Sequence, residues 1–136
     1  MFLLDTNVVS ELRKAQADNK VVAWARSVAA PSLFLSAITV LELETGILRI
    51  ERRDPAQGGL LRSWLDNHVM PAFAGRILAV DSAVALRCAR LHVPDRSNEC
   101  DVLIAATALV HGLTVVTRNV ADFQSSGVRL INPWVD

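Results

Sequence analysis

Short apolar runs alternate along this chain with longer stretches whose apolar residues recur at helical spacing. The runs at residues 2–4, 33–35, 76–81, 113–117 and 128–131 have the length and composition of buried strands. Helices are expected at residues 8–12, 21–29, 39–53, 60–69, 82–91 and 99–111. The pattern therefore predicts strands and helices in alternation, which favours an α/β fold with a mainly parallel sheet of about five strands.

The helix at residues 99–111 is apolar around nearly its whole circumference, so we expect it to be buried on most sides. Elsewhere, proline and glycine residues set the expected boundaries of the helices. Asp54-Pro55 and Gly58-Gly59 predict a turn over residues 54–59, and Pro71 predicts the end of the helix at residues 60–69. We see no internal repeat or linker, and we expect residues 1–136 to form a single domain.

Composition narrows the class of protein. Hydrophobic residues make up 51% of the 136 residues, yet no apolar run reaches the roughly 20 residues that span a bilayer. Residues 1–20 do not have the pattern of a secretion signal, and Cys88 and Cys100 have no metal-binding or redox spacing, which favours a reducing, cytoplasmic location. Fourteen basic residues balance fourteen acidic ones, so net charge gives no reason to expect nucleic-acid binding.

Oxygen-bearing side chains recur where predicted strands end or the next helices begin. Asp5 follows the first strand and Glu42 is expected in the first turn of the helix after the second strand. Asp101 opens the apolar helix, and Asn119 follows the fourth strand with Asp122 close behind. Because the carboxyl ends of parallel strands meet at one edge of a sheet, the sequence predicts a single acidic cluster there.

Each of these acids also has a structural explanation. Asp5 can cap the helix that follows it. Thr39 with Glu42, and Asn98 with Asp101, have the spacing of a capping box, in which the first residue caps the helix. Capping and a functional site both remain open for these residues at this stage.

Several carboxylates that converge in one place repel one another, so they stay ionised together only around a strong positive charge. Oxygen ligands suit Mg²⁺ or Mn²⁺, and the chain has no cysteine and histidine pattern for zinc. Such ions stabilise charge on phosphoryl oxygens and lower the pKa of bound water, as phosphodiester hydrolysis requires. If the acids converge, a metal-dependent hydrolase of phosphodiesters is the function they favour.

The same residues fall in motifs of a known family. The motifs are LLDTN at residues 3–7, LSAITVLEL at 35–43 with Gly46, DVLIAATA at 101–108, TRN at 117–119 with Asp122-Phe123, and NPW at 132–134. In this order, and over essentially the whole chain, they resemble the PIN-domain ribonucleases, in particular the VapC-type toxins of bacterial toxin–antitoxin pairs. The resemblance implies a three-layer α/β/α PIN-like domain.

The resemblance also assigns roles by motif position. It implies that Mg²⁺ or Mn²⁺ is bound by three acids: Asp5, Asp101 and Glu42. Hydrogen bonds to them are expected from Thr6, Asn7 and Thr117. Some members of the family have an aspartate where Asn119 stands, and here Asp122 is a candidate for the fourth catalytic acid. Arg118 is a candidate contact for RNA phosphate.

The implied function is that of a metal-dependent endoribonuclease, the toxin of a pair, which a small cognate antitoxin inhibits. The implied assembly is a homodimer. Two alternatives remain. A catalytically silent PIN-like domain would only bind a partner, and Asn119 keeps this alternative open. An aspartyl-phosphate phosphatase or receiver domain would use Asp5 as the phosphorylated residue, but Thr6-Asn7 lacks the second aspartate that such phosphatases carry two positions on.

Overall fold

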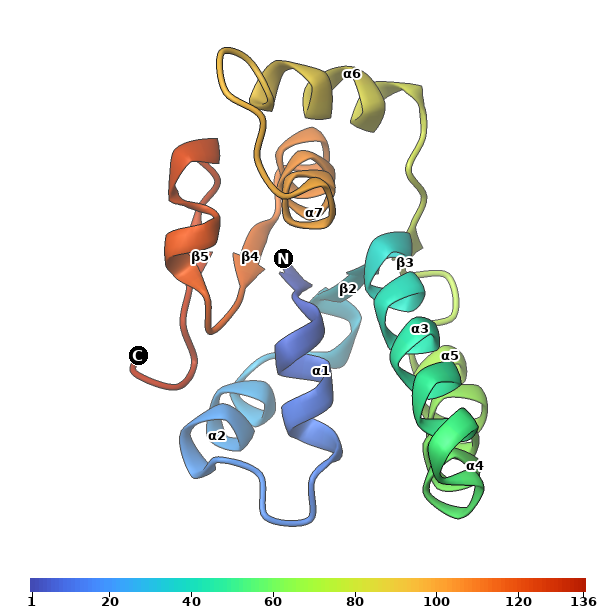
Figure 1. Ribbon diagram of the computed structural model, residues 1–136. Coiled ribbons are helices and arrows are strands. Elements are labelled where there is room, and N and C mark those ends of the chain that lie inside the picture. The colour runs from blue at the N-terminus through green and yellow to red at the C-terminus, as the bar shows by residue number, and fades with distance from the viewer.

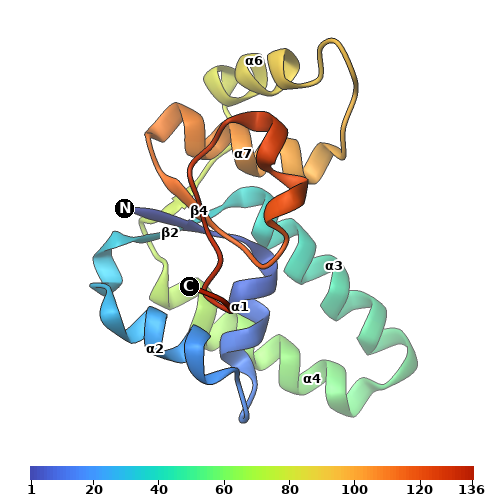
Figure 2. The same ribbon diagram turned by 90° about the vertical axis from the view of Figure 1, so that its left-hand side faces the viewer.

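A parallel sheet of five strands forms the centre of the molecule in the computed structural model, which describes residues 1–136 (Figures 1 and 2). The strands are β1 (Phe2–Leu4), β2 (Leu33–Ser36), β3 (Ile77–Leu78), β4 (Thr114–Val116) and β5 (Leu130–Ile131), and their order in the sheet is β3-β2-β1-β4-β5. All four ladders are parallel, as the alternating pattern predicted. The first strand of the chain is thus the middle strand of the sheet.

Helices cover both faces of this sheet (Figure 1). They are α1 (Thr6–Arg13), α2 (Asn19–Ser27), α3 (Ala37–Arg53), α4 (Pro55–Trp64), α5 (Met70–Ala72), α6 (Ser82–Leu91) and α7 (Glu99–His111). A π-helical segment, Leu65–Val69, joins α4 to α5, and 3₁₀ turns lie at Ala30–Ser32, Val120–Asp122 and Gln124–Ser126. The fold is the expected α/β/α arrangement. None of the helices combines the length and hydrophobicity needed to cross a membrane.

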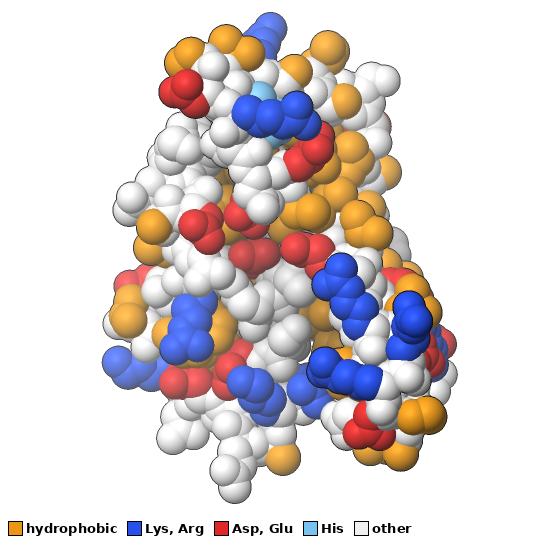
Figure 3. Space-filling view, viewed as in Figure 1, with side chains coloured by type: hydrophobic (Ala, Val, Ile, Leu, Met, Phe, Trp, Pro, Cys, Tyr) orange, Lys and Arg blue, Asp and Glu red, His pale blue; other side chains and the backbone are white.

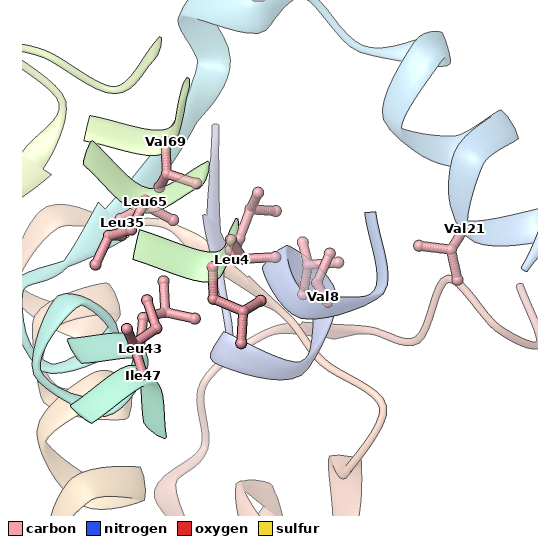
Figure 4. Close-up of a cluster of buried hydrophobic side chains, with 11 residues drawn as sticks. Leu4, Val8, Val21, Leu35, Leu43, Ile47, Leu65 and Val69 are labelled. Carbon is pink, nitrogen blue, oxygen red and sulfur yellow. The ribbon is translucent and has the colours of Figure 1, made fainter. Parts of the chain in front are cut away.

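Successive strand residues face opposite sides of the sheet, and this alternation divides the core in two. On one side, Leu4 of β1 and Val116 of β4 pack with side chains from α1, α2, α3 and α4 in a cluster of 11 buried residues (Figure 4). On the other side, Leu3 and Val115 pack against α7 in a cluster of nine, which includes the fully buried ring of Phe123. The central position of α7 agrees with its apolar sequence.

The predicted turn at residues 54–59 was wrong. Helix α4 begins at Pro55, where a proline costs no hydrogen bond, and the Asp54 side chain caps it by accepting a hydrogen bond from Gln57 N–H. Gly58 and Gly59 therefore lie inside the helix. A Cβ atom built on Gly58 would lie 2.6 Å from Glu51 Cα, so this glycine lets α4 pack directly against the backbone of α3.

Other boundaries also differ from expectation. Pro71 does not end the helix, because the chain turns through the wider π segment first and Phe73 N–H still donates to the Val69 carbonyl. The strand expected at residues 76–81 is reduced to β3, since its only neighbour, β2, ends at Ser36, which pairs with Leu78. Strands β4 and β5 are likewise shorter than the predicted runs by two residues each.

Candidate active site

Asp5 directly follows the middle strand, and its backbone N–H and side chain together form four hydrogen bonds. Its backbone N–H donates to the Val116 carbonyl of β4 (2.9 Å). Its Oδ1 accepts from Thr6 N–H (2.8 Å), while Oδ2 accepts from the Thr117 hydroxyl (2.8 Å) and from Asn7 Nδ2 (3.2 Å). The side chain thus caps α1 through Oδ1, as the structural interpretation predicted, while Oδ2 is held by Thr117 and Asn7.

The electrostatic environment of Asp5 disfavours its charge. The residue is 5% exposed, and burial raises the pKa of its carboxyl above the usual value. The hydrogen bonds from Thr117 and Thr6 act in the opposite direction, and the charges of Glu42 and Asp122 raise the pKa further. Asp5 is therefore a buried acid that lies within range of two other carboxylates.

Glu42 lies on α3, one turn further along than predicted. The cap of α3 is Ser36, whose Oγ accepts from Ile38 N–H (3.0 Å), so the predicted capping box led by Thr39 was wrong. Thr39 is instead fully buried inside the helix, and Glu42 is in the second turn. The Thr6 hydroxyl donates to Glu42 Oε1 (2.6 Å) and lies 3.4 Å from Thr39 Oγ1. This contact joins the start of α1 to α3 and fixes the Glu42 carboxylate.

Asp101 stands in the first turn of α7, where its backbone N–H donates to Oδ1 of the cap residue Asn98 (3.1 Å), as the sequence predicted. The residue is half-buried. Burial, followed by the charges of Asp5, Asp122 and Glu42, raises the pKa of Asp101 to about 6. The structure therefore places Asp101 within electrostatic range of these three carboxylates, at the carboxyl edge of the sheet.

Asn119 and Asp122 contribute differently to the site. The backbone N–H of Asn119 donates to Thr117 Oγ1 (3.0 Å), but its exposed side chain forms no hydrogen bond within the protein. Asp122 ends the 3₁₀ turn Val120–Asp122, and its charge raises the pKa of both Asp5 and Asp101. The fourth negative charge of the cluster thus comes from Asp122.

The donor set of the cluster consists of oxygen atoms, which suits a hard divalent cation. No group of three or more His, Cys, Asp or Glu side chains converges as a preformed set of metal ligands. Mg²⁺ does not need one, because it is commonly held by one or two carboxylates and keeps several water ligands. Four mutually repelling carboxylates, one with a pKa near 6, fit such an ion chemically.

The surface around the acids is hollowed and flanked by positive charge. Figure 3 shows acidic side chains near the middle of this face, with Lys and Arg side chains below them on both sides. A groove of about 180 Å³ runs from Thr6 and Glu42, between α1 and the α3–α4 pair, to Arg13 and Trp64. Sequence reasoning missed this groove, since its far end comes from helices whose packing no motif reveals.

Arg118 also lies beside the acids. Its backbone N–H donates to Asn7 Oδ1 (3.3 Å), and Asn132 Nδ2 donates to its carbonyl (3.4 Å). Its guanidinium stands over the Trp134 ring, 5.3 Å from the centroid. The main chain of Arg118 is thus tied to a residue that itself bonds Asp5.

Comparison with known proteins identifies relatives that match over nearly the whole chain. A profile of the PIN domain matches residues 2–125. The chain is 39% identical over 142 residues to VapC ribonuclease Y4jK of Sinorhizobium fredii, with 98% of each protein covered. It is 39% identical over 141 residues to toxin FitB of Neisseria gonorrhoeae, with both chains fully covered. The crystal structure of FitAcB from Neisseria gonorrhoeae superimposes with a TM-score of 0.90 over 98% of this chain and 99% of that one.

Proposed function

Because the chain belongs to the PIN-domain family, we propose that it is a metal-dependent endoribonuclease that acts as the toxin of a toxin–antitoxin pair. The relatives support the ribonuclease and toxin parts of this proposal. One is named a VapC ribonuclease and another a toxin, and both align over their full length at 39% identity. We also propose that residues 1–136 act as a single domain, because strands near both ends of the chain lie in one sheet.

The observation that carries the proposal is the convergence of four carboxylates at the sheet edge. Their charges oppose one another, and the pKa of Asp101 rises to about 6 as a result of burial and of this repulsion. A purely structural role would not favour such an arrangement, because neighbouring like charges destabilise one another, most of all at the buried Asp5. Binding of a divalent cation would relieve the repulsion and supply the chemistry.

Asp5, Asp101 and Glu42 would hold Mg²⁺ or Mn²⁺. When bound, the ion would polarise the scissile phosphate and lower the pKa of the attacking water. The protein's part is to hold the carboxylates in place. Thr117 and Asn7 orient Asp5, and the helix dipole of α7 favours the charge of Asp101.

Glu42 has a second proposed role. Its Oε1 is held by the Thr6 hydroxyl, which leaves the other carboxylate oxygen to accept a proton from the attacking water. Hydrolysis in this way would leave a 5′-phosphate and a 3′-hydroxyl. Asp122 is the proposed fourth acid of the site, in place of Asn119, because its charge reaches both Asp5 and Asp101.

The proposed partners are a second copy of the chain and a small cognate antitoxin. FitAcB and other solved relatives support an antitoxin partner, since they include toxin–antitoxin complexes. The groove from Glu42 to Trp64 opens directly from the acids, so a segment of antitoxin placed over it would block the site. Inhibition by the antitoxin is part of this proposal, as is a cytoplasmic location.

The test is cleavage of total RNA by the purified chain with Mn²⁺ or Mg²⁺, with the ends of the fragments mapped. We expect cuts that require the metal, disappear with EDTA and carry 5′-phosphates. Asp5→Asn should abolish them, whereas Asp66→Asn, a change at an exposed position of the π segment, should not. Folded protein, freed of any co-purified antitoxin, that neither cleaves RNA nor binds Mn²⁺ would instead indicate a silent binding domain.

A further inference from the structure

Two arginines beside the acidic cluster are held by tryptophan rings. The Arg118 guanidinium lies 5.3 Å from the centroid of Trp134, and that of Arg13 lies 5.9 Å from the centroid of Trp64. A cation–π contact of this kind favours one position of the guanidinium and leaves its N–H donors free. Both arginine side chains are exposed, so these donors face solvent.

Neither guanidinium has a carboxylate or carbonyl partner in the protein, which sets this pair apart from other fixed arginines. Arg62 is bound to Glu44 and Glu51. Arg76 also stands over an aromatic ring, but its guanidinium donates to three backbone carbonyls. Arg118 and Arg13 are therefore each positioned by an aromatic ring and retain unused donors.

The charge of Arg118 contributes to lowering the pKa of Glu11, but the Glu11 carboxylate already accepts hydrogen bonds from other groups. It accepts hydrogen bonds from Asp18 N–H (2.9 Å) and from the Lys14 ammonium (3.1 Å). No salt bridge joins it to Arg118. The Arg118 guanidinium is thus available to a ligand.

The sheet order places these two arginines on opposite sides of Asp5. Arg118 follows β4, one neighbour of the middle strand β1. Arg13 lines the groove that begins at Glu42, and Glu42 belongs to the helix that follows β2, the other neighbour of β1. A chain that passes over the acids can therefore meet one guanidinium on each side.

We propose that Arg118 and Arg13, each held on its tryptophan, bind the phosphates of single-stranded RNA on the two sides of the bond that is cleaved. This inference rests on the proposed ribonuclease function. The planar fork of arginine matches a phosphate with two N–H donors. Fixing the guanidinium beforehand reduces the conformational entropy lost on binding.

The experiment measures binding of a fluorescein-labelled oligouridylate of about 12 nucleotides by fluorescence anisotropy, in EDTA so that no cleavage occurs. The variants are Arg118→Ala and Arg13→Ala, with Arg87→Ala on the exposed side of α6 as the matched loss of one charge. Each of the first two should weaken binding roughly 5- to 10-fold at low salt. Each should also reduce the slope of log affinity against log salt by about 0.7, the contribution of one phosphate on a single strand.

Two further readouts separate binding from folding. Arg118→Lys keeps the charge and should retain most of the salt slope. Trp134→Phe keeps an aromatic ring under Arg118 and should therefore retain most of the RNA binding. In cleavage assays with Mn²⁺, Arg118→Ala should raise KM several-fold and leave kcat within about twofold, as expected when a ground-state contact is lost.

Several results would overturn the inference. If Arg118→Ala and Arg13→Ala had the affinity and salt slope of Arg87→Ala while the unmodified chain cleaved RNA, this inference would fail and the proposed function would stand. The same holds if the two changes weakened only binding of a cognate antitoxin, since the guanidinium groups would then recognise protein. An unmodified chain that neither bound nor cleaved RNA would overturn both proposals.

Discussion

Removal of the Asp101 charge should make the metal-free protein more stable while abolishing its activity. Burial and three neighbouring carboxylates raise the pKa of Asp101 from 3.8 to about 6, so the folded state disfavours the ionised form. A carboxyl with a raised pKa contributes stability that is fully present below the unfolded pKa and is lost as pH rises through the folded value. Above pH 6 the charge of Asp101 therefore destabilises the fold, and Asp101→Asn should relieve this.

The size of the effect follows from the pKa. A shift from 3.8 to about 6 corresponds to about 3 kcal/mol in full, and solvent screening of this half-buried group reduces it to about half. The substitution also removes the favourable interaction of the carboxylate with the dipole of α7, which reduces the gain by about 0.5 kcal/mol. About 1 kcal/mol remains, which for a chain of this length raises Tm by about 4 °C.

The assay is thermal unfolding of the Asp101→Asn and unmodified chains in EDTA between pH 5 and 8, with Asp66→Asn as the exposed control. The gain in Tm should be largest above pH 7 and should shrink as pH falls through 6. Added Mn²⁺ should raise the Tm of the unmodified chain more than that of the variant. A lower Tm for Asp101→Asn at pH 7.5, or a gain that does not depend on pH, would refute the repulsion argument.

Three other predictions concern the site and the helix pair beside it. Thr6→Val removes the hydrogen bond to Glu42 and should lower kcat about 10-fold with little change in Tm, as steady-state cleavage would measure. Gly58→Ala should lower the free energy of unfolding by about 1–3 kcal/mol in denaturant titrations, because its Cβ would overlap the backbone of α3. Gly59→Ala, which has open space around it, should raise that free energy by about 0.5–1 kcal/mol. Asp122→Asn should reduce both the cleavage rate and the affinity for Mn²⁺, and isothermal titration with unchanged affinity would count against its place in the site.

The sheet could be predicted from the sequence because its signals are local. Each strand is a short apolar run, and residues 99–111 carry enough apolar character to identify the buried helix α7 without any tertiary information. The α3–α4 pair could not be predicted in the same way. Its close contact at Gly58 depends on how two helices meet, and locally a glycine pair after a proline is equally typical of a turn.

The candidate site, too, could be predicted from the sequence only in part. Asp5, Glu42 and Asp101 come close together because parallel strands end at one edge of the sheet, and the apolar runs in the sequence show where the strands end. The link between Thr6 and Glu42 does not follow from it, because it depends on the angle between α1 and α3. The expectation that Thr39 caps α3 failed because Ser36, three residues earlier, is an equally good cap and ends β2 directly.

The bond between the Thr117 hydroxyl and Asp5 joins residues 112 positions apart. Strand β1 is therefore made well before its partner β4 and before the threonine that orients its acid. An incomplete chain therefore has neither the middle of the sheet nor an oriented Asp5. For a nuclease synthesised among the cell's own RNAs, this connectivity delays an oriented Asp5 until β4 has been made and has paired with β1.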